Sequence, residues 1–289
     1  MSLSWGVLCA FIALIGWGLG DFFIQRGMRL VGFYQTLFII TAASTPILLP
    51  FVYGDLIHLS ASNLYALFTL SIIIFLYAKV LFSAFEEGKI SVVEAVIGVE
   101  LPLTVALGVF LGGERMSLVQ FLLFMVISSG LLLAVTTHFG ALRKKARLFE
   151  KGVALALLGA VLSALTNFYV GTNAQTISPL MTIWFTHAVI AVICLCALFY
   201  RGELRALPRN IKKHPLPLLS LCLFDNAAWI GFAFATTLIP ISLAVTISES
   251  YIALAALLGY FINREKLRAH QFAGASLAIV GVIALASTL

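Results

Sequence analysis

Charged residues are scarce in this chain of 289 residues, because only 10% are Asp, Glu, Lys or Arg while 62% are hydrophobic. Soluble domains carry about 25% charged residues. Together with a mean hydropathy of +1.08, this composition excludes an ordinary soluble domain. It predicts a polytopic membrane protein.

Disulfide frameworks and catalytic motifs are also missing. The chain has four cysteines, all inside apolar runs, and Cys194 and Cys196 diverge on a helix, so neither a disulfide set nor a metal site is expected. There is no HExxH, GxSxG or paired aspartate motif, which makes an intramembrane enzyme the least favoured function. The GWGLG at 16–20 has no following Lys-Ser/Thr, so it predicts close helix packing rather than a phosphate loop. We therefore expect no metal and no cofactor.

Long apolar runs dominate what is present. A membrane-spanning helix needs about 20 apolar residues. The first run lacks the basic start of a cleavable signal peptide, so we expect it to be retained as a span. The longest connections, 139–151 and 201–214, leave no room for an attached soluble domain. The sequence predicts ten spans, at 3–24, 33–53, 63–85, 90–111, 118–138, 152–173, 179–200, 215–238, 241–262 and 268–288.

Basic residues gather in alternate connections. Of 18 Lys and Arg, 16 fall on one side of the predicted spans, Arg115 falls on the other, and Lys79 lies within a span. Short basic loops stay in the cytoplasm. The pattern predicts that both termini lie outside a cytoplasmic (inner) membrane, and it explains the net charge of +6 without a nucleic-acid partner.

The second half of the chain repeats the first. Residues 90–135 align without gaps on 241–286, with ten identities in 46 positions, including Glu114 with Glu265. Upstream, Asp21 aligns with Asn167. We expect two five-helix repeats, 1–138 and 152–289, joined by a cytoplasmic linker at 139–151. Because five is odd, the repeats are inverted in the membrane, which is a transporter architecture.

GGERMSLVQFLLFMVISSG and its echo NREKLRAHQFAGASLAIVG, with GWGLGDFFIQRG in the first span, resemble the drug/metabolite transporter superfamily and its EamA-type domains. The resemblance covers essentially the whole chain. It implies an all-α integral membrane fold of ten helices, with a central cavity lined by helices one to four and six to nine. It also implies a secondary transporter or exporter of amino acids, metabolites, sugars or drugs. Many relatives have cytoplasmic termini, whereas the charges here predict the reverse.

Acidic residues inside the spans are the leading candidates for function. Glu100 lies near the middle of the fourth span, where a charge costs at least about 2.5 kcal/mol, so it is a candidate for binding a cation or a proton. Glu94 is nearer the cytoplasmic end, at the depth of Lys79, and we expect these two to pair. Pro102 removes a backbone hydrogen bond and weakens the helix around residue 98.

The second half supplies Asp225 and Glu249, again well inside spans. Asp21 and Asn167 are expected nearer the helix ends. His187 can titrate near neutral pH, although a histidine bonded to a neighbouring backbone carbonyl is the more common situation. Glu114 and Glu265 precede the fifth and tenth helices, where carboxylates stabilise helix N-termini, so we interpret them as structural caps rather than ligands.

Trp17 and Trp229 lie within spans and could contact a cationic or aromatic substrate, while ordinary packing explains each one alone. More acids than bases inside the spans favour a small polar or amine-bearing substrate, such as an amino acid, or coupling to protons. The sequence thus predicts a secondary transporter working by alternating access, proton-coupled or as an exchanger, and a monomer or weak homodimer in the bilayer. A receptor or scaffold without transport is the other alternative.

Overall fold

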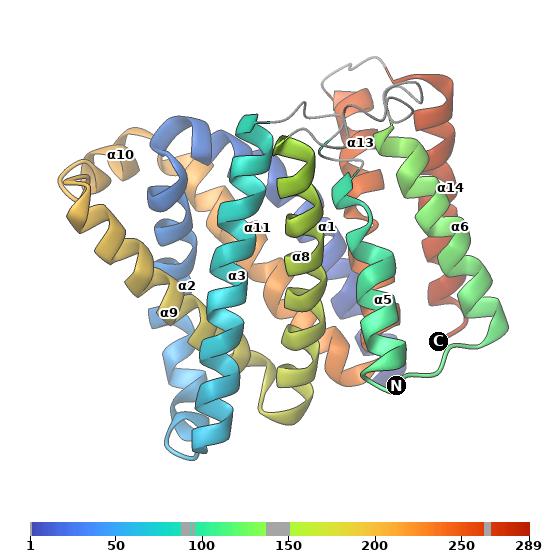
Figure 1. Ribbon diagram of the computed structural model, residues 1–289, viewed down its shortest axis with the longest axis horizontal. Helices are drawn as coiled ribbons and strands as arrows, with labels where there is room; N and C mark the ends of the chain where they lie inside the picture. The colour runs from blue at the N-terminus through green and yellow to red at the C-terminus, as the bar shows by residue number, and fades with distance from the viewer. Residues whose placement is uncertain (1, 88–92, 94–95, 137–150, 263–266) are drawn as a thin grey trace.

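The chain folds into a bundle of helices that stand side by side (Figure 1). This computed structural model describes residues 2–87, 93, 96–136, 151–262 and 267–289, and within them every regular element is a helix. The helices are α1 (Ser2–Val31), α2 (Phe33–Leu56), α3 (Ala61–Glu87), α5 (Glu100–Phe110), α6 (Leu118–Val135), α8 (Lys151–Thr176), α9 (Pro179–Tyr200), α10 (Leu207–Lys213), α11 (Pro215–Leu238), α12 (Ile241–Ser248), α13 (Tyr251–Ile262) and α14 (Ala269–Ala286).

Nine helical segments of the described chain are long and apolar enough to cross a membrane, with α12 and the start of α13 counted as one segment. The apolar helix α5 has only 11 described residues. It belongs to the fourth predicted span, 90–111, part of which lies outside the described residues. The multi-pass helical class is therefore confirmed, while the count of ten spans stays a prediction.

Two segments differ from the sequence prediction. We expected the first span to end at residue 24, but α1 continues to Val31, so Arg26 and Arg29 lie on the helix. The apolar run stops earlier than the helix because polar residues can extend a helix beyond the hydrocarbon; α1 ends only at Gly32, whose φ of 81° is costly for any other residue. The loop 201–214 contains the short helix α10, which begins with Pro208 in its first turn and which we had not predicted.

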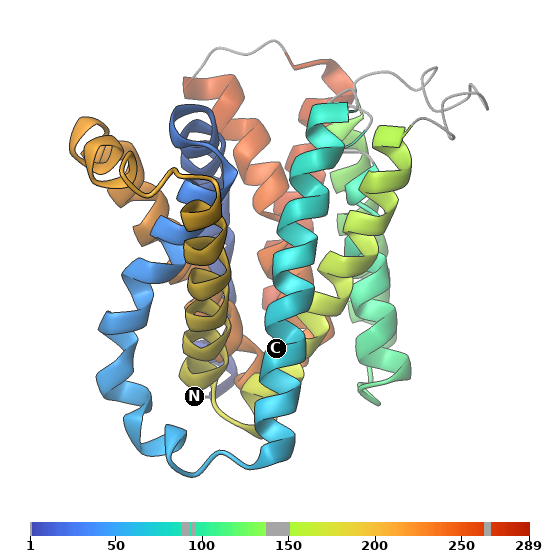
Figure 2. The ribbon, with the colours of Figure 1, turned by 60° about the vertical axis from the view of Figure 1, so that its left-hand side comes forward.

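Each main packing contact joins a helix of the first half to one of the second. Helix α1 packs on α11, α2 on α9, α3 on α8, and α6 on α14 (Figures 1 and 2). In the repeat alignment, α1 is equivalent to α8 and α3 to α11, so the pair α1–α11 is equivalent to the pair α8–α3. The pairs α2–α9 and α6–α14 each join two equivalent helices. Exchanging the halves therefore leaves this set of contacts unchanged.

Small residues permit the closest of these contacts. A Cβ added at Gly16 of α1 would lie 2.8 Å from the Ala228 Cβ of α11. This close approach supports the interpretation of GWGLG as a packing motif.

Helices α6 and α14 pack with their backbones nearly touching. A Cβ added at Gly274 would lie 2.6 Å from the carbonyl oxygen of Gly130 and 2.8 Å from the amide nitrogen of Ala134, and one at Gly281 would lie 2.8 Å from Ile127. Higher residue numbers on one helix meet lower numbers on the other, so the two helices are antiparallel. Gln271 donates from Nε2 to the carbonyl oxygen of Ala134 at 3.2 Å, which also ties the start of α14 to the end of α6.

Gly274→Ala is expected to lower the free energy of unfolding by roughly 1–3 kcal/mol, because overpacking forces backbones apart. Gly54→Ala is the matched control, since Gly54 also lies in a helix but a Cβ there meets nothing within 4 Å. Melting temperatures of the two purified variants would be compared with the parent. Equal melting temperatures for Gly274→Ala and the parent would contradict the close contact.

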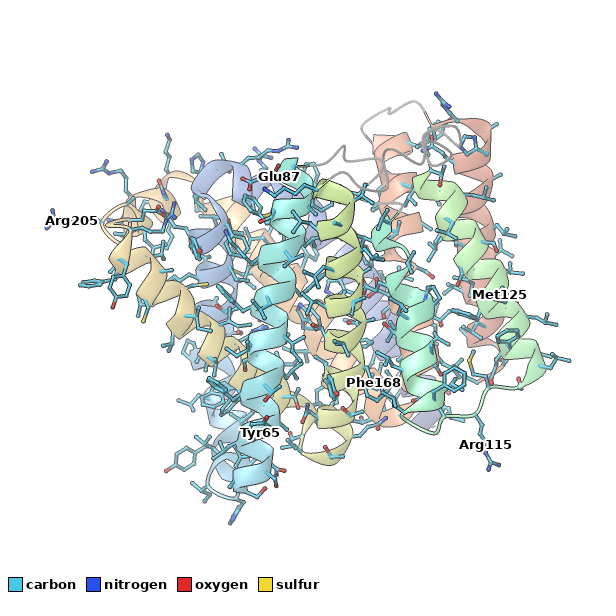
Figure 3. All side chains as sticks on the ribbon, in the orientation of Figure 1. Tyr65, Glu87, Arg115, Met125, Phe168 and Arg205 are labelled. Carbon is cyan, nitrogen blue, oxygen red and sulfur yellow. The ribbon has the colours of Figure 1, made fainter. Side chains whose placement is uncertain are left out.

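One end of the bundle carries Arg29 in the last turn of α1 and Lys212 and Lys213 in the last turn of α10. Figure 3 shows Arg205 and Glu87 at one end and Arg115 and Tyr65 at the other. The end with Arg205, which also carries the last turns of α1 and the start of α8, is called the basic end below, and the opposite end is called the Arg115 end. Both chain termini lie toward the Arg115 end (Figures 1 and 2).

Candidate functional site

A cavity of about 210 Å³ lies between the helices of the two halves of the chain. Its described lining comes from α1, α2, α3, α5, α8, α9 and α11 and from the α12–α13 segment, and no described lining residue comes from α6 or α14. Most of its surface is apolar. Six of the candidate residues line it: Trp17, Glu100, His187, Asp225, Trp229 and Glu249.

Most of the described lining of the cavity lies in the half of the molecule nearer the basic end. On α2 its lining runs from Phe33 only to Thr41, and on α3 from Ile74 only to Phe85, near the C-terminus of that helix. The other half is filled with side chains, for example the fully buried Val52, Leu67 and Met181. Along α2 and α3, the described lining of the cavity therefore extends toward the basic end and not toward the Arg115 end.

Two broken helices meet at the inner end of the cavity. The α12–α13 segment is interrupted by a turn at Glu249 and Ser250, and a turn at Gly98 and Val99 directly precedes α5. These positions are equivalent in the 151-residue repeat shift, so the two halves break at the same place. The sequence predicted the first break from Pro102, and the second has no proline near it. Turns inside spans leave backbone groups available to a cavity.

Glu100 and Glu249 come together at these breaks through Asn167. The side-chain nitrogen of Asn167 on α8 donates to the Glu100 carboxylate at 2.8 Å and to the Glu249 carboxylate at 3.1 Å. All three side chains are buried, with exposed fractions of 2–7%. Glu100 is also the first residue of α5, where the helix dipole favours negative charge. Buried carboxylates must be met by donors or counter-charges, and one amide here serves two of them.

A third acid and a histidine lie on another part of the wall. Asp225 of α11 and His187 of α9 are both buried and both line the cavity. His187 Nδ1 shares a hydrogen bond with the Ser44 hydroxyl at 2.7 Å. We had expected a carbonyl partner for a structural histidine; the partner is a hydroxyl from α2, and the ring also faces the cavity. Asn226, next to Asp225, donates to the Ile40 carbonyl at 3.2 Å and so ties α11 to α2.

Aromatic rings form a continuous group beside Glu249. The rings of Trp17 and Trp229 meet edge to face with centroids 5.1 Å apart, and Tyr251 lies 6.0 Å from Trp17. Phe232 packs behind them, fully buried, at 5.6 Å from Trp17. Aromatic faces near carboxylates suit an organic cation.

Lys79 contacts aromatic rings. Its ammonium group lies 5.2 Å from the ring centre of Phe33, 5.4 Å from that of Tyr34 and 6.0 Å from that of Phe82. Phe33 and Phe82 line the cavity, but Lys79 is not among its lining residues. Glu94, its expected partner, lies outside the described residues, so their pairing stays a prediction. Asp21 lies in α1, and its side chain is likewise outside the described part.

Glu114 caps a helix, but not the one expected. Its carboxylate accepts hydrogen bonds from the backbone amides of Ile241 and Ser242, at the start of α12 in the other half, the second of them at 2.8 Å. The following helix α6 is capped instead by Ser117 and Gln120. Glu114 therefore caps a helix N-terminus as expected, but the helix is α12 and not α6. The sequence did not indicate this, because a contact between the two halves has no local sequence pattern. Glu265 lies outside the described residues.

Asn167 is the site residue that sequence reasoning misjudged. We placed it near a helix end, whereas it is buried in α8 between the two glutamates. The available signal was its alignment with Asp21, a polar residue at the same place in each half. Within the described residues no group of three or more His, Cys, Asp or Glu side chains could hold a metal ion.

Comparison with known proteins identifies the family. The EamA-like transporter family matches residues 4–136 and 150–287, which together cover almost the whole chain. No curated protein matches. A solved structure titled "Crystal structure of protein" is similar over 98% of this chain and 97% of its own, with a TM-score of 0.71 and 15% identity, which shows a shared fold. With two family units of helices around a central cavity, the chain belongs to the EamA-like transporter family of the drug/metabolite transporter superfamily.

Proposed function

We propose that this protein is a secondary transporter that moves a small amine-bearing molecule, such as an amino acid or a cationic drug, across the cytoplasmic membrane. The observation that supports this substrate class is the meeting of Glu100 and Glu249 at Asn167 in the cavity wall. An ammonium group placed there can donate to both carboxylates at once.

The charges of the wall favour a cation. Among the described lining residues three are carboxylates, Glu100, Asp225 and Glu249, and none is Lys or Arg. Carboxylates in an apolar cavity are costly unless a cation or protons neutralise them. The aromatic group of Trp17, Trp229 and Tyr251 can cover the apolar part of such a substrate.

Alternating access is the mechanism we propose. The cavity reaches toward the basic end while the Arg115 half is packed, as in one of two access states. The breaks at 98–99 and 249–250 give each half a point at which a helix can bend. The antiparallel pairing of α6 with α14 and the exchange symmetry of the helix contacts support inverted repeats of five helices each.

Energy for transport comes from a gradient, by proton coupling or exchange, since the sequence has no nucleotide-binding motif. Reconstituted protein would separate these two: exchange needs substrate on both sides, whereas proton coupling needs a pH difference. We expect the protein to act as a monomer or weak homodimer.

The orientation is predicted from the basic end, which should face the cytoplasm. In a cysteine-free background, Arg205→Cys should be labelled by an impermeant reagent only after the cytoplasmic side is opened, and Arg115→Cys should be labelled from outside. Both residues are exposed. The opposite pattern would reverse the orientation and place both termini in the cytoplasm.

The substrate test has two steps. Purified protein is screened by thermal shift against amino acids, polyamines, nucleosides and cationic drugs, because a ligand of the folded state raises the melting temperature. Compounds that bind are then assayed for flux into liposomes, with protein-free liposomes as control. Flux of an amine would support the proposal. Binding without flux would favour a receptor, chemical conversion would favour an enzyme, and flux of anions alone would overturn the substrate class.

A further inference from the structure

The connection between α5 and α6 reaches across the molecule to the other half. It leaves α5 through Gly112 and Gly113, the latter with a φ of 68°, and it brings Glu114 to the first turn of α12. The amides of Ile241 and Ser242 are donors that a helix cannot satisfy internally, and the residue before them is Pro240. One carboxylate of the first half thus supplies the N-terminal cap for a helix of the second.

The surroundings of Glu114 are shaped for this contact. Its backbone amide donates to the carbonyl oxygen of Gly108 at 3.1 Å. A Cβ added at Gly108 would lie 2.7 Å from Glu114 Oε2, so the carboxylate occupies space that only a glycine leaves. Ile241 in turn fits against Gly171 of α8, where an added Cβ would lie 2.7 Å from its side chain.

Helix α12 links this contact to the site. All eight of its residues are buried, and Glu249 follows as its C-terminal cap. A short helix that is packed on every side moves as a rigid unit, so a shift at Ile241 is passed to Glu249. The Glu114 contact also lies in the half that the cavity does not enter.

From these contacts we infer that Glu114 is a positioning residue for transport: it holds α12 so that Glu249 meets Asn167 and the Arg115 end stays closed. The inference rests on the proposed function, because it says that Glu114 stabilises one of the two access states of a transporter. Charge-assisted hydrogen bonds are the stronger kind, and both must break before α12 can move away from the first half. Loss of the carboxylate therefore favours the state that opens at the Arg115 end.

Thiol labelling tests this inference without measuring flux. Ser248→Cys reports on the end of α12, which is fully buried, and Met28→Cys reports on the basic side of the cavity. In a cysteine-free background with Glu114→Gln, labelling of position 248 from the Arg115 end should rise by about tenfold to a hundredfold, as expected for lost charge-assisted hydrogen bonds. Labelling of position 28 from the basic end should fall. A purely structural loosening would raise both rates.

Two further variants make the result decisive. Glu87→Gln is the matched control, since it makes the same change at an exposed carboxylate that pairs with Lys151 at the basic end, and it should leave both rates unchanged. Gly108→Ala displaces the Glu114 carboxylate without changing charge, and it should reproduce Glu114→Gln.

Parent labelling rates in both Glu114→Gln and Gly108→Ala would overturn the inference. So would a failure of both variants to fold, since Glu114 would then be a purely structural residue. Absence of flux in the parent would count against the proposed function alone.

Discussion

Glu100→Gln is expected to reduce concentrative uptake by about tenfold to a hundredfold, the effect of removing one charged partner from a binding site. The glutamine side chain has nearly the same shape and still offers an oxygen to Asn167, so the bundle should fold and insert normally. The loss should therefore appear in uptake into liposomes and not in the melting temperature.

The control for this experiment is Glu203→Gln, which removes a carboxylate that pairs with Arg201 outside the cavity. Its uptake should equal that of the parent. Glu249→Gln should behave like Glu100→Gln, because both carboxylates receive the same amide. Normal concentrative uptake by Glu100→Gln would remove this residue from the mechanism.

Asn167→Leu is expected both to destabilise the protein and to abolish uptake. Leucine has a similar volume, but it removes one hydrogen bond from each of two buried carboxylates. A hydrogen bond to a charged group contributes roughly 1.5–3 kcal/mol. Asn173→Leu is the matched control on the same helix, because Asn173 is also buried and, among the described residues, its side-chain nitrogen donates to the carbonyl of Tyr169 in the same helix. We expect a smaller fall in melting temperature there and retained uptake.

A double-mutant cycle extends the Asn167 experiment. If Asn167 stabilises the protein by serving the glutamates, Asn167→Leu should cost less free energy in a Glu100→Gln, Glu249→Gln background than in the parent, since neutral amides need less compensation. Equal costs in the two backgrounds would show that Asn167 acts through packing alone.

Hydrophobic runs were sufficient to predict most of the helices, because a bilayer requires nearly the same length and composition of each span. The predicted ranges 179–200 and 215–238 coincide with α9 and α11. The prediction failed where a helix continues beyond its apolar residues, as α1 does to Val31. Hydropathy indicates which residues can lie in the hydrocarbon, but it does not indicate where the backbone hydrogen bonds of the helix end.

The broken helices show a different limit. Pro102 marks the break before α5 by its own chemistry, whereas nothing local marks the break at Glu249 and Ser250. Only the equivalence of Gly98 and Glu249 in the repeat could have indicated it. A carboxylate at such a turn is stabilised by groups from other helices, which a single sequence does not display.

The cost of burying a charge made Glu100, Glu249 and Asp225 the candidate site residues, and all three line the cavity. It could not select Asn167, since a neutral amide in a helix looks unremarkable until its neighbours are known. The prediction for Glu114 was wrong for a similar reason. Local sequence patterns predict caps that are close to the helix in sequence, whereas Glu114 caps a helix that starts 127 residues later.

Membrane voltage would act unevenly along this molecule. An electric potential falls mainly across material of low dielectric constant, and here that material is the packed Arg115 half. If the protein carries a cation as proposed and is open at the basic end, a cation that reaches Glu100 and Glu249 through the cavity crosses little of the potential. Moving the charge past the packed half then crosses most of the membrane potential. Crossing a full 100 mV changes the energy of one elementary charge by about 2.3 kcal/mol. Voltage would thus change the rate of reorientation rather than the affinity measured from the open side.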